Sequence, residues 1–280
     1  FFLPESPRWL CSQGREDEAR RILRRLHGRR AQRELEEISQ TIEIGKKTHL
    51  WRELFSRRVR PILLLGILLF FFQQLSGINV IIYYAPTIFK EMALGSHIVT
   101  LLATVGIGAI NVLATFIAIR WVEKVGRRPL LIWGFVGTAC SLALIAVITY
   151  LDIPQLRWIS VASLCAYIVA FAASLGPLPW VMMPEIFPLH VRGQGSSFSA
   201  GSNWAFNTLV VATFPIFLQN FGISLTFALY ALACILGLLF TIRYVPETKC
   251  LSLERIEKHV RSGKAFRLLG RSIKTRRLTK

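Results

Sequence analysis

Four polar side chains within one uncharged stretch are the residues of this chain best suited to bind a small polar molecule. They are Gln73, Gln74, Ser76 and Asn79. The stretch runs from Pro61 to Phe89, carries no charged residue, and is long enough to cross a bilayer as a helix. An amide in hydrocarbon is costly if its hydrogen bonds go unmade, so these side chains need partners there.

The same stretch contains residues that can interrupt a helix. Gly77 lies among the polar side chains and Pro86 follows them, so the helix can open locally and offer backbone groups as well. Interrupted membrane helices of this kind mark substrate sites near the midplane of transporters. The alternative interpretation is that the amides only hold neighbouring helices together, as a single Asn or Gln often does.

Later uncharged stretches carry further polar and aromatic side chains at membrane depth. These are Asn111, Trp180, Asn203, Trp204 and Asn207. Trp180 follows two prolines in the segment LGPLPW, and these prolines remove backbone hydrogen bonds and predict a bend. An indole can stack on an apolar sugar face while its N–H donates, although a core or interfacial tryptophan is the alternative interpretation.

Composition predicts an all-α membrane protein with six transmembrane helices, preceded by short cytoplasmic helices. Hydrophobic residues make up 53% of 280, and uncharged runs recur along the chain. The expected spans are roughly 61–89, 97–121, 129–150, 158–182, 195–218 and 223–244. The last two share one run, which is too long for a single crossing and is interrupted at Gln219-Asn220-Phe221-Gly222.

The charge distribution argues against a nucleic-acid partner despite a net charge of +18. Of the 34 Lys and Arg residues, 15 precede Pro61 and 12 lie at Arg243 or later. If the basic ends are inside the cell, Lys90 and Arg157 are the only basic residues in outer connections. This asymmetry predicts a multi-pass protein of the plasma (inner) membrane with both ends of the chain cytoplasmic.

We expect four regions along the chain. They are the end of a preceding transmembrane helix (1–3), a cytoplasmic helical linker (4–60), the bundle (61–245) and a basic cytoplasmic tail (246–280). Because the chain opens on Phe1-Phe2-Leu3, without an initiator methionine, we expect it to be part of a longer protein.

Glutamates and arginines recur at the predicted cytoplasmic junctions. They are Glu5, Arg8, Glu123, Arg127, Arg128, Glu185, Arg192 and Glu247. Carboxylate and guanidinium pairs at helix ends can hold those ends together in one conformation and release them in another. For any single arginine, an ordinary positive-inside or snorkelling role is the alternative.

The sequence does not predict an enzyme. Its five histidines are scattered, and it has no metal-ligand spacing, phosphate-binding glycine loop or nucleophile motif. Its five cysteines form no C-x-x-C pair, so we expect free thiols, and we expect no cofactor and no metal.

Several motifs together resemble the sugar porter family of the major facilitator superfamily. They are PESPRWL, QQLSGIN followed by YY, EKVGRRP, LGPLPW, PEIF with Arg192, SNW and PETK. The resemblance covers the second half of a twelve-helix fold and is closest to bacterial sugar symporters and facilitative glucose transporters. It departs from the family at Cys250, where glycine is usual, and at Glu123-Lys124, where an acid is usually followed by arginine.

The resemblance implies a function and a site. The substrate-binding positions would be Gln73, Gln74, Asn79, Tyr83, Asn111, Trp180, Asn203 and Trp204, and the charged junctions would form a cytoplasmic gate. The implied protein is a carrier of a monosaccharide, a hexose or a pentose, that works by alternating access with a six-helix N-terminal half. Proton coupling stays open, since no Asp or Glu lies within the expected spans. The alternatives are a transport-inactive sugar sensor of the same fold and a carrier of a polyol such as inositol.

Overall fold

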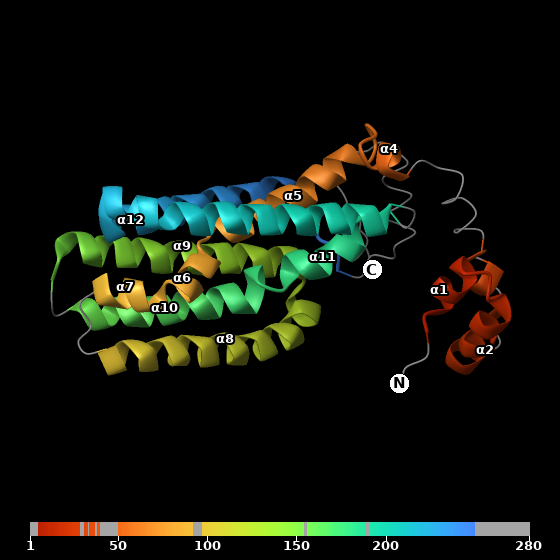
Figure 1. Cartoon of the computed structure of the whole chain (residues 1–280), viewed down its shortest axis with the longest axis horizontal. Helices are drawn as coiled ribbons and strands as arrows, with labels where there is room; N and C mark the ends of the chain where they lie inside the picture. The colour runs from red at the N-terminus through yellow and green to blue at the C-terminus, as the bar shows by residue number, and fades with distance from the viewer. Residues whose placement is uncertain are drawn as a thin grey trace, which may run out of the picture.

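The computed structural model describes residues 5–28, 31–32, 34–36, 38–39, 50–91, 97–153, 156–188 and 191–249. This part of the chain is helical and contains no strand. Within it, five helices are long and apolar enough to cross a membrane. They run side by side in one bundle (Figure 1). The prediction of an all-α membrane protein is therefore confirmed.

The first membrane-spanning segment is broken where the polar residues cluster. It consists of α5 (Arg60–Leu75), α6 (Ile78–Tyr83) and α7 (Ala85–Glu91), and it covers the span expected over 61–89, with the local opening predicted near Gly77. Gly77 separates α5 from α6 with a φ of 86°, in the left-handed region. A Cβ at Gly77 would also lie 3.1 Å from the ring of Tyr230. Glycine is therefore required here by backbone conformation and by space.

The fourth segment is interrupted by its prolines, as predicted. It consists of α10 (Arg157–Ala170), a π-helical turn η3 (Phe171–Leu175) and α11 (Leu178–Ile186). The N–H of Gly176 donates to the carbonyl of Phe171, five residues back, at 2.9 Å. Pro179 has no N–H for the carbonyl of Leu175, which must therefore find another partner.

The remaining spans are α8 (His97–Val125), α9 (Arg127–Leu151) and α12 (Arg192–Tyr244). Gly222, within the 53 residues of α12, has φ 70° and ψ 177°, which are not helical, so two helices meet there. Figure 1 shows the chain folding back at this point. The two arms of α12 and the other four spans give six crossings in the described part of the chain, with the reversal inside the predicted interruption.

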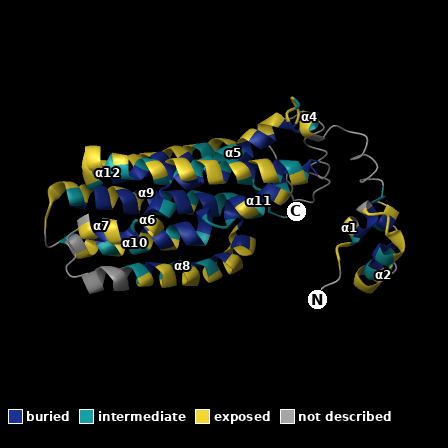
Figure 2. Ribbon diagram, viewed as in Figure 1, coloured by how far each residue is buried: buried dark blue, intermediate teal, exposed yellow. Residues whose placement is uncertain are grey.

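The core of the bundle lies where α12 packs against α5 and α9. Large side chains such as Phe135, Phe214 and Phe227 are fully buried there. In an apolar 18-residue window of the first span 61% is buried, whereas the corresponding share in α8, within Thr104–Val125, is 22%. Figure 2 shows exposed residues along much of α8. This helix therefore offers most of its surface to lipid or to another part of the protein.

Short helices precede the bundle, and those whose bounds the structure describes are α1 (Pro7–Ser12), α2 (Glu16–His27) and α4 (Leu50–Leu54). Leu10, Ala19 and Leu23 belong to a small apolar core separate from that of the bundle. Glu5 pairs with Arg15, Oε2 to Nη1 at 3.2 Å. The side chain of Arg8 lies outside the described residues.

Cysteines are free thiols wherever the structure describes them. These are Cys11, Cys140, Cys165 and Cys234. Burial raises the pKa of the Cys11 thiol. Cys250 and the basic tail that follows it lie outside the described residues.

Candidate functional site

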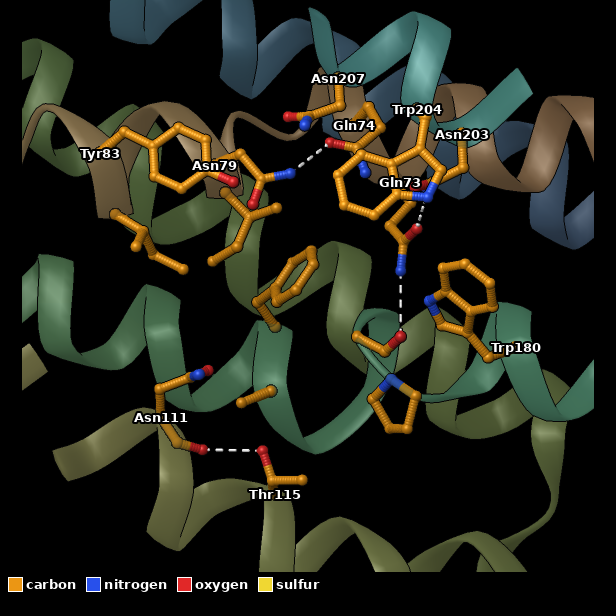
Figure 3. Close-up of a pocket in the computed structure, with 16 residues that line it drawn as sticks. Gln73, Gln74, Asn79, Tyr83, Asn111, Thr115, Trp180, Asn203, Trp204 and Asn207 are labelled. Atoms are coloured by element: carbon orange, nitrogen blue, oxygen red, sulfur yellow. Dashed lines mark hydrogen bonds between the residues drawn. The ribbon is translucent and has the colours of Figure 1, made fainter. Parts of the chain in front are cut away.

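A cavity of about 420 Å³ lies in the bundle between the broken helices. It falls within the range of roughly 300 to 1,000 Å³ usual for small-molecule sites. All eight predicted substrate-binding residues line it: Gln73, Gln74, Asn79, Tyr83, Asn111, Trp180, Asn203 and Trp204. Figure 3 shows these side chains converging from α5, α6, α8, α11 and α12.

Gln73 links three elements around the cavity. Its Nε2 donates to the carbonyls of Leu175 at 2.7 Å and Gly176 at 3.0 Å. The Leu175 carbonyl is the one that Pro179 cannot satisfy, so the amide replaces a missing helical hydrogen bond. The Oε1 of Gln73 accepts from Nδ2 of Asn203 at 2.8 Å. The buried Gln73 side chain thus joins α5 to the proline break and to α12.

Gln74 and Asn79 pair across the break between α5 and α6. Nδ2 of Asn79 donates to Oε1 of Gln74 at 2.8 Å. This leaves the Nε2 of Gln74 as a donor and the Oδ1 of Asn79 as an acceptor, neither with a hydrogen bond to a described residue. A sugar hydroxyl both donates and accepts, so it can bind to either atom.

Three aromatic side chains at the cavity are partly open to its surroundings. Tyr83 is 56% exposed, Trp180 46% and Trp204 64%. Trp180 packs edge-on against Phe70, with ring centroids 4.8 Å apart. This contact fixes one indole while leaving a face available for stacking. The exposure of all three rings means that the cavity opens to one side of the bundle.

Two polar lining residues were not among the predicted site residues. Thr115 follows Asn111 by one helical turn and donates to its backbone carbonyl at 2.8 Å. Asn207 follows Asn203 by one turn, and its buried Oδ1 has no hydrogen-bond partner in the described part of the chain. Residues four apart share a helix face, and that spacing was the available signal.

The charged end of the bundle is held by an ion pair between α9 and α11. Nη2 of Arg127 lies 2.7 Å from Oε1 of Glu185, and Nε of the same arginine lies 3.2 Å from that oxygen. Both side chains are largely buried. The hydroxyl of Thr248 donates to the other oxygen of Glu185 at 2.6 Å. The carboxylate therefore connects three parts of the chain.

Glu247 caps the start of α9. Its two carboxylate oxygens accept from the backbone N–H groups of Arg127 and Arg128, each at 3.1 Å. A carboxylate at a helix N-terminus satisfies unpaired donors and complements the helix dipole. Gly126 makes room for it, since a Cβ there would lie 2.8 Å from Glu247 Oε2.

The other predicted gate residues make different contacts. Nη2 of Arg128 donates to the carbonyl of Ile242 at 2.7 Å, near the end of α12. Nε of Arg192 donates to the carbonyl of Phe187 at 3.4 Å. Glu123 is exposed near the end of α8 and forms no ion pair with a described residue. Of the predicted gate residues that the structure describes, Arg127 and Glu185 are the two that pair with each other.

A bundle of interrupted membrane helices around an amide-lined cavity is typical of solute carriers. The family described as Sugar (and other) transporter matches residues 1–259. The chain belongs to this family, and its fold is half of a major facilitator fold.

Two relatives illustrate the similarity. The putative metabolite transport protein YwtG of Bacillus subtilis is 42% identical over 268 residues, which are 93% of this chain and 57% of that protein. The galactose-proton symporter of Escherichia coli is 40% identical over 275 residues, covering 96% of this chain and 59% of the symporter. The chain thus spans little more than half the length of these relatives.

Solved structures agree with the family. The proton:xylose symporter XylE bound to 6-bromo-6-deoxy-D-glucose matches with a TM-score of 0.78 and 36% identity, over 91% of this chain and 54% of XylE. The inward-open conformation of XylE from E. coli matches with a TM-score of 0.66 and 33% identity, over 91% and 52%. The described arrangement is therefore more similar to the sugar-bound structure than to the inward-open one.

Proposed function

We propose that this chain is half of a carrier that moves a monosaccharide, a hexose or a pentose, across a membrane by alternating access. The observation that carries the proposal is the pair formed by Gln74 and Asn79, which leaves an amide donor and an acceptor at the cavity. The names of two relatives, a galactose-proton symporter and a xylose symporter, support a sugar as the substrate.

The chemistry of the cavity suits a neutral polyhydroxyl compound. Among the described residues, its polar lining consists of amides, hydroxyls and indole N–H groups and contains no charged side chain. Such groups match sugar hydroxyls without burying a charge. Trp180 and Trp204 supply aromatic faces on which the apolar side of a sugar ring can stack. A charged substrate would lack a counter-charge here.

The gate proposal rests on the ion pair between Arg127 and Glu185 at the end of the bundle that we assign to the cytoplasm. This pair, together with the cap that Glu247 provides, holds α9, α11 and the segment after α12 in one arrangement. Opening toward the cytoplasm would require the contacts to loosen. The lower TM-score with inward-open XylE, 0.66 against 0.78, supports a gate that is not open to the cytoplasm in this arrangement.

The partner of this chain would be a six-helix half that completes the carrier around the cavity. The open side marked by Tyr83, Trp180 and Trp204 is the side that such a half would cover. No Asp or Glu lies within the expected spans, so a proton-carrying carboxylate would have to come from that other half. Facilitated and proton-coupled transport both remain compatible with this chain.

Uptake of labelled monosaccharides by the full-length protein in proteoliposomes tests the proposal. We expect saturable uptake of at least one hexose or pentose and its loss in Gln74→Ala. Binding of a sugar without uptake would identify a sensor instead. Uptake of inositol in preference to every monosaccharide would identify a polyol carrier. A proton gradient that leaves the uptake rate unchanged would exclude proton coupling.

A further inference from the structure

A buried tyrosine outside the cavity contacts the break that separates Gln74 from Asn79. Tyr167, on α10, is fully buried. Its hydroxyl donates to the backbone carbonyl of Ser76 at 2.9 Å and lies 3.3 Å from the Ser76 hydroxyl. Ser76 is also fully buried, and it lies between the two members of the amide pair.

The Ser76 carbonyl is one of the groups that the break leaves without a helical partner. In a continuous helix it would accept from the N–H of Val80, four residues on. That bond is absent from the described backbone, whereas the next one, from Ile81 to the carbonyl of Gly77, forms at 3.0 Å. An unpaired carbonyl in a dry core is costly, and the Tyr167 hydroxyl supplies the missing donor.

Ser76 also connects this contact to the polar cluster. Its hydroxyl donates to the carbonyl of Gln73 at 2.6 Å. The side chain of Gln73 in turn donates a hydrogen bond to the carbonyl of Leu175, which lies on the same segment as Tyr167. The fourth segment is therefore hydrogen-bonded to this region at two points, through Tyr167 to Ser76 and through the Leu175 carbonyl to Gln73.

We infer that Tyr167 is a positioning residue for the sugar site: its hydroxyl fixes the α5–α6 break so that Asn79 meets Gln74 at the cavity. This inference rests on the proposed function, because it assigns Tyr167 a role in sugar binding at that site. Tyr167 itself does not line the cavity. Its effect on a sugar must therefore pass through α6.

The chain provides a matched control for the loss of one hydroxyl. Tyr230 is also buried, and its ring lies 3.1 Å from the position that a Cβ at Gly77 would take. Unlike that of Tyr167, its hydroxyl has no hydrogen-bond partner among the residues that the structure describes. Tyr167→Phe and Tyr230→Phe are the same chemical change beside the same break, and only the first removes a hydrogen bond.

The experiment measures the Kd of several monosaccharides with the full-length protein. We expect Tyr167→Phe to raise the Kd of the preferred sugar about tenfold, as the loss of one buried hydrogen bond implies. Tyr230→Phe should bind like the parent. A role in stability alone would lower the unfolding temperature while leaving the Kd of the folded protein unchanged.

A double-mutant cycle decides whether Tyr167 acts through Asn79. If it does, Tyr167→Phe should change the Kd by less than about twofold in an Asn79→Ala background, because coupled residues are not additive. Additive effects, parent-like binding by Tyr167→Phe, or failure of that variant to fold would each overturn the inference. If Asn79→Ala alone binds every sugar like the parent, the proposed sugar site itself is wrong.

Discussion

Asn79 donates a hydrogen bond to Gln74 at 2.8 Å, although the two residues are five positions apart. In an uninterrupted helix, residues three or four apart are neighbours, and residues five apart point in different directions. The left-handed conformation of Gly77 reorients α6 and brings the two amides together. The geometry of the candidate site therefore depends on the backbone conformation of Gly77, a residue that has no side chain with which to bind a substrate.

Gly77→Ala should destabilise the full-length protein and weaken sugar binding. A left-handed conformation costs an L-residue about 1 to 2 kcal/mol, and the new Cβ would press on the Tyr230 ring at 3.1 Å. Thermal unfolding in detergent and a Kd measurement check this. Gly106→Ala is the control, since a Cβ there meets nothing within 4 Å. Equal stability and affinity for Gly77→Ala and the parent would contradict the account.

Sequence motifs alone identified residues that lie together in the structure. The residues assigned by motif all line one cavity, and the interruption near Gly77 and the bend at the prolines were both predicted. These features depend on the local sequence. A glycine or a proline affects the backbone conformation of the few residues around it, and an amide in an apolar run needs a hydrogen-bond partner there.

Partners distant in sequence could not be predicted. The sequence shows that Pro179 leaves a carbonyl unsatisfied, but not that Gln73, 102 positions away from Leu175, satisfies it. In the same way it marks Glu247 as charged but not as the cap of α9. Glu5 pairs with Arg15 because the turn after α1 brings that arginine close, which spacing alone did not reveal.

Arg127→Ala should lower transport while leaving sugar binding largely intact. A charge-assisted hydrogen bond contributes about 1.5 to 3 kcal/mol, so losing the pair with Glu185 should shift the conformational equilibrium roughly tenfold to a hundredfold. Uptake and binding are measured on the same preparation of the full-length protein. Arg120→Ala, at an exposed arginine near the same end of the bundle, should transport normally. Normal uptake by a well-expressed Arg127→Ala protein would refute the gate assignment.

The 280-residue chain alone should not catalyse uptake, because alternating access needs a second half to rock against. Reconstituting this chain by itself in liposomes and measuring sugar flux checks the expectation. Adding the other half of the protein as a separate polypeptide should restore flux if the two assemble. Robust flux with this chain alone would contradict a carrier that needs two six-helix halves.

The last part of the basic tail, residues 258–280, lies outside the described residues and should bind anionic membranes. Basic residues from Lys264 to Lys280 are interleaved with Phe266, Leu269 and Ile273 at helical spacing. Each basic residue near an anionic surface contributes about 1 kcal/mol. A peptide of residues 258–280 should therefore bind vesicles containing anionic lipid more tightly than neutral ones. Equal binding to both would favour a tail that is merely disordered and basic.

The aromatic and the amide residues of the proposed sugar site should affect the affinity for sugars in different ways. Trp180→Ala should weaken all sugars to a similar extent, because stacking on a ring face does not depend on a particular hydroxyl. Gln74→Ala should change the ranking among epimers, because the amide binds one hydroxyl. The relevant measurement is the Kd of a panel of epimeric monosaccharides for each variant.

The most direct test of the account is the binding of that panel to Gln74→Ala and Asn79→Ala in the full-length protein. A hydroxyl left unpaired in a dry site costs about 1 to 3 kcal/mol, so we expect affinity to fall roughly tenfold to a hundredfold for the preferred sugar. If both variants remain folded and bind every sugar like the parent, the amides only hold helices together and the sugar site lies elsewhere.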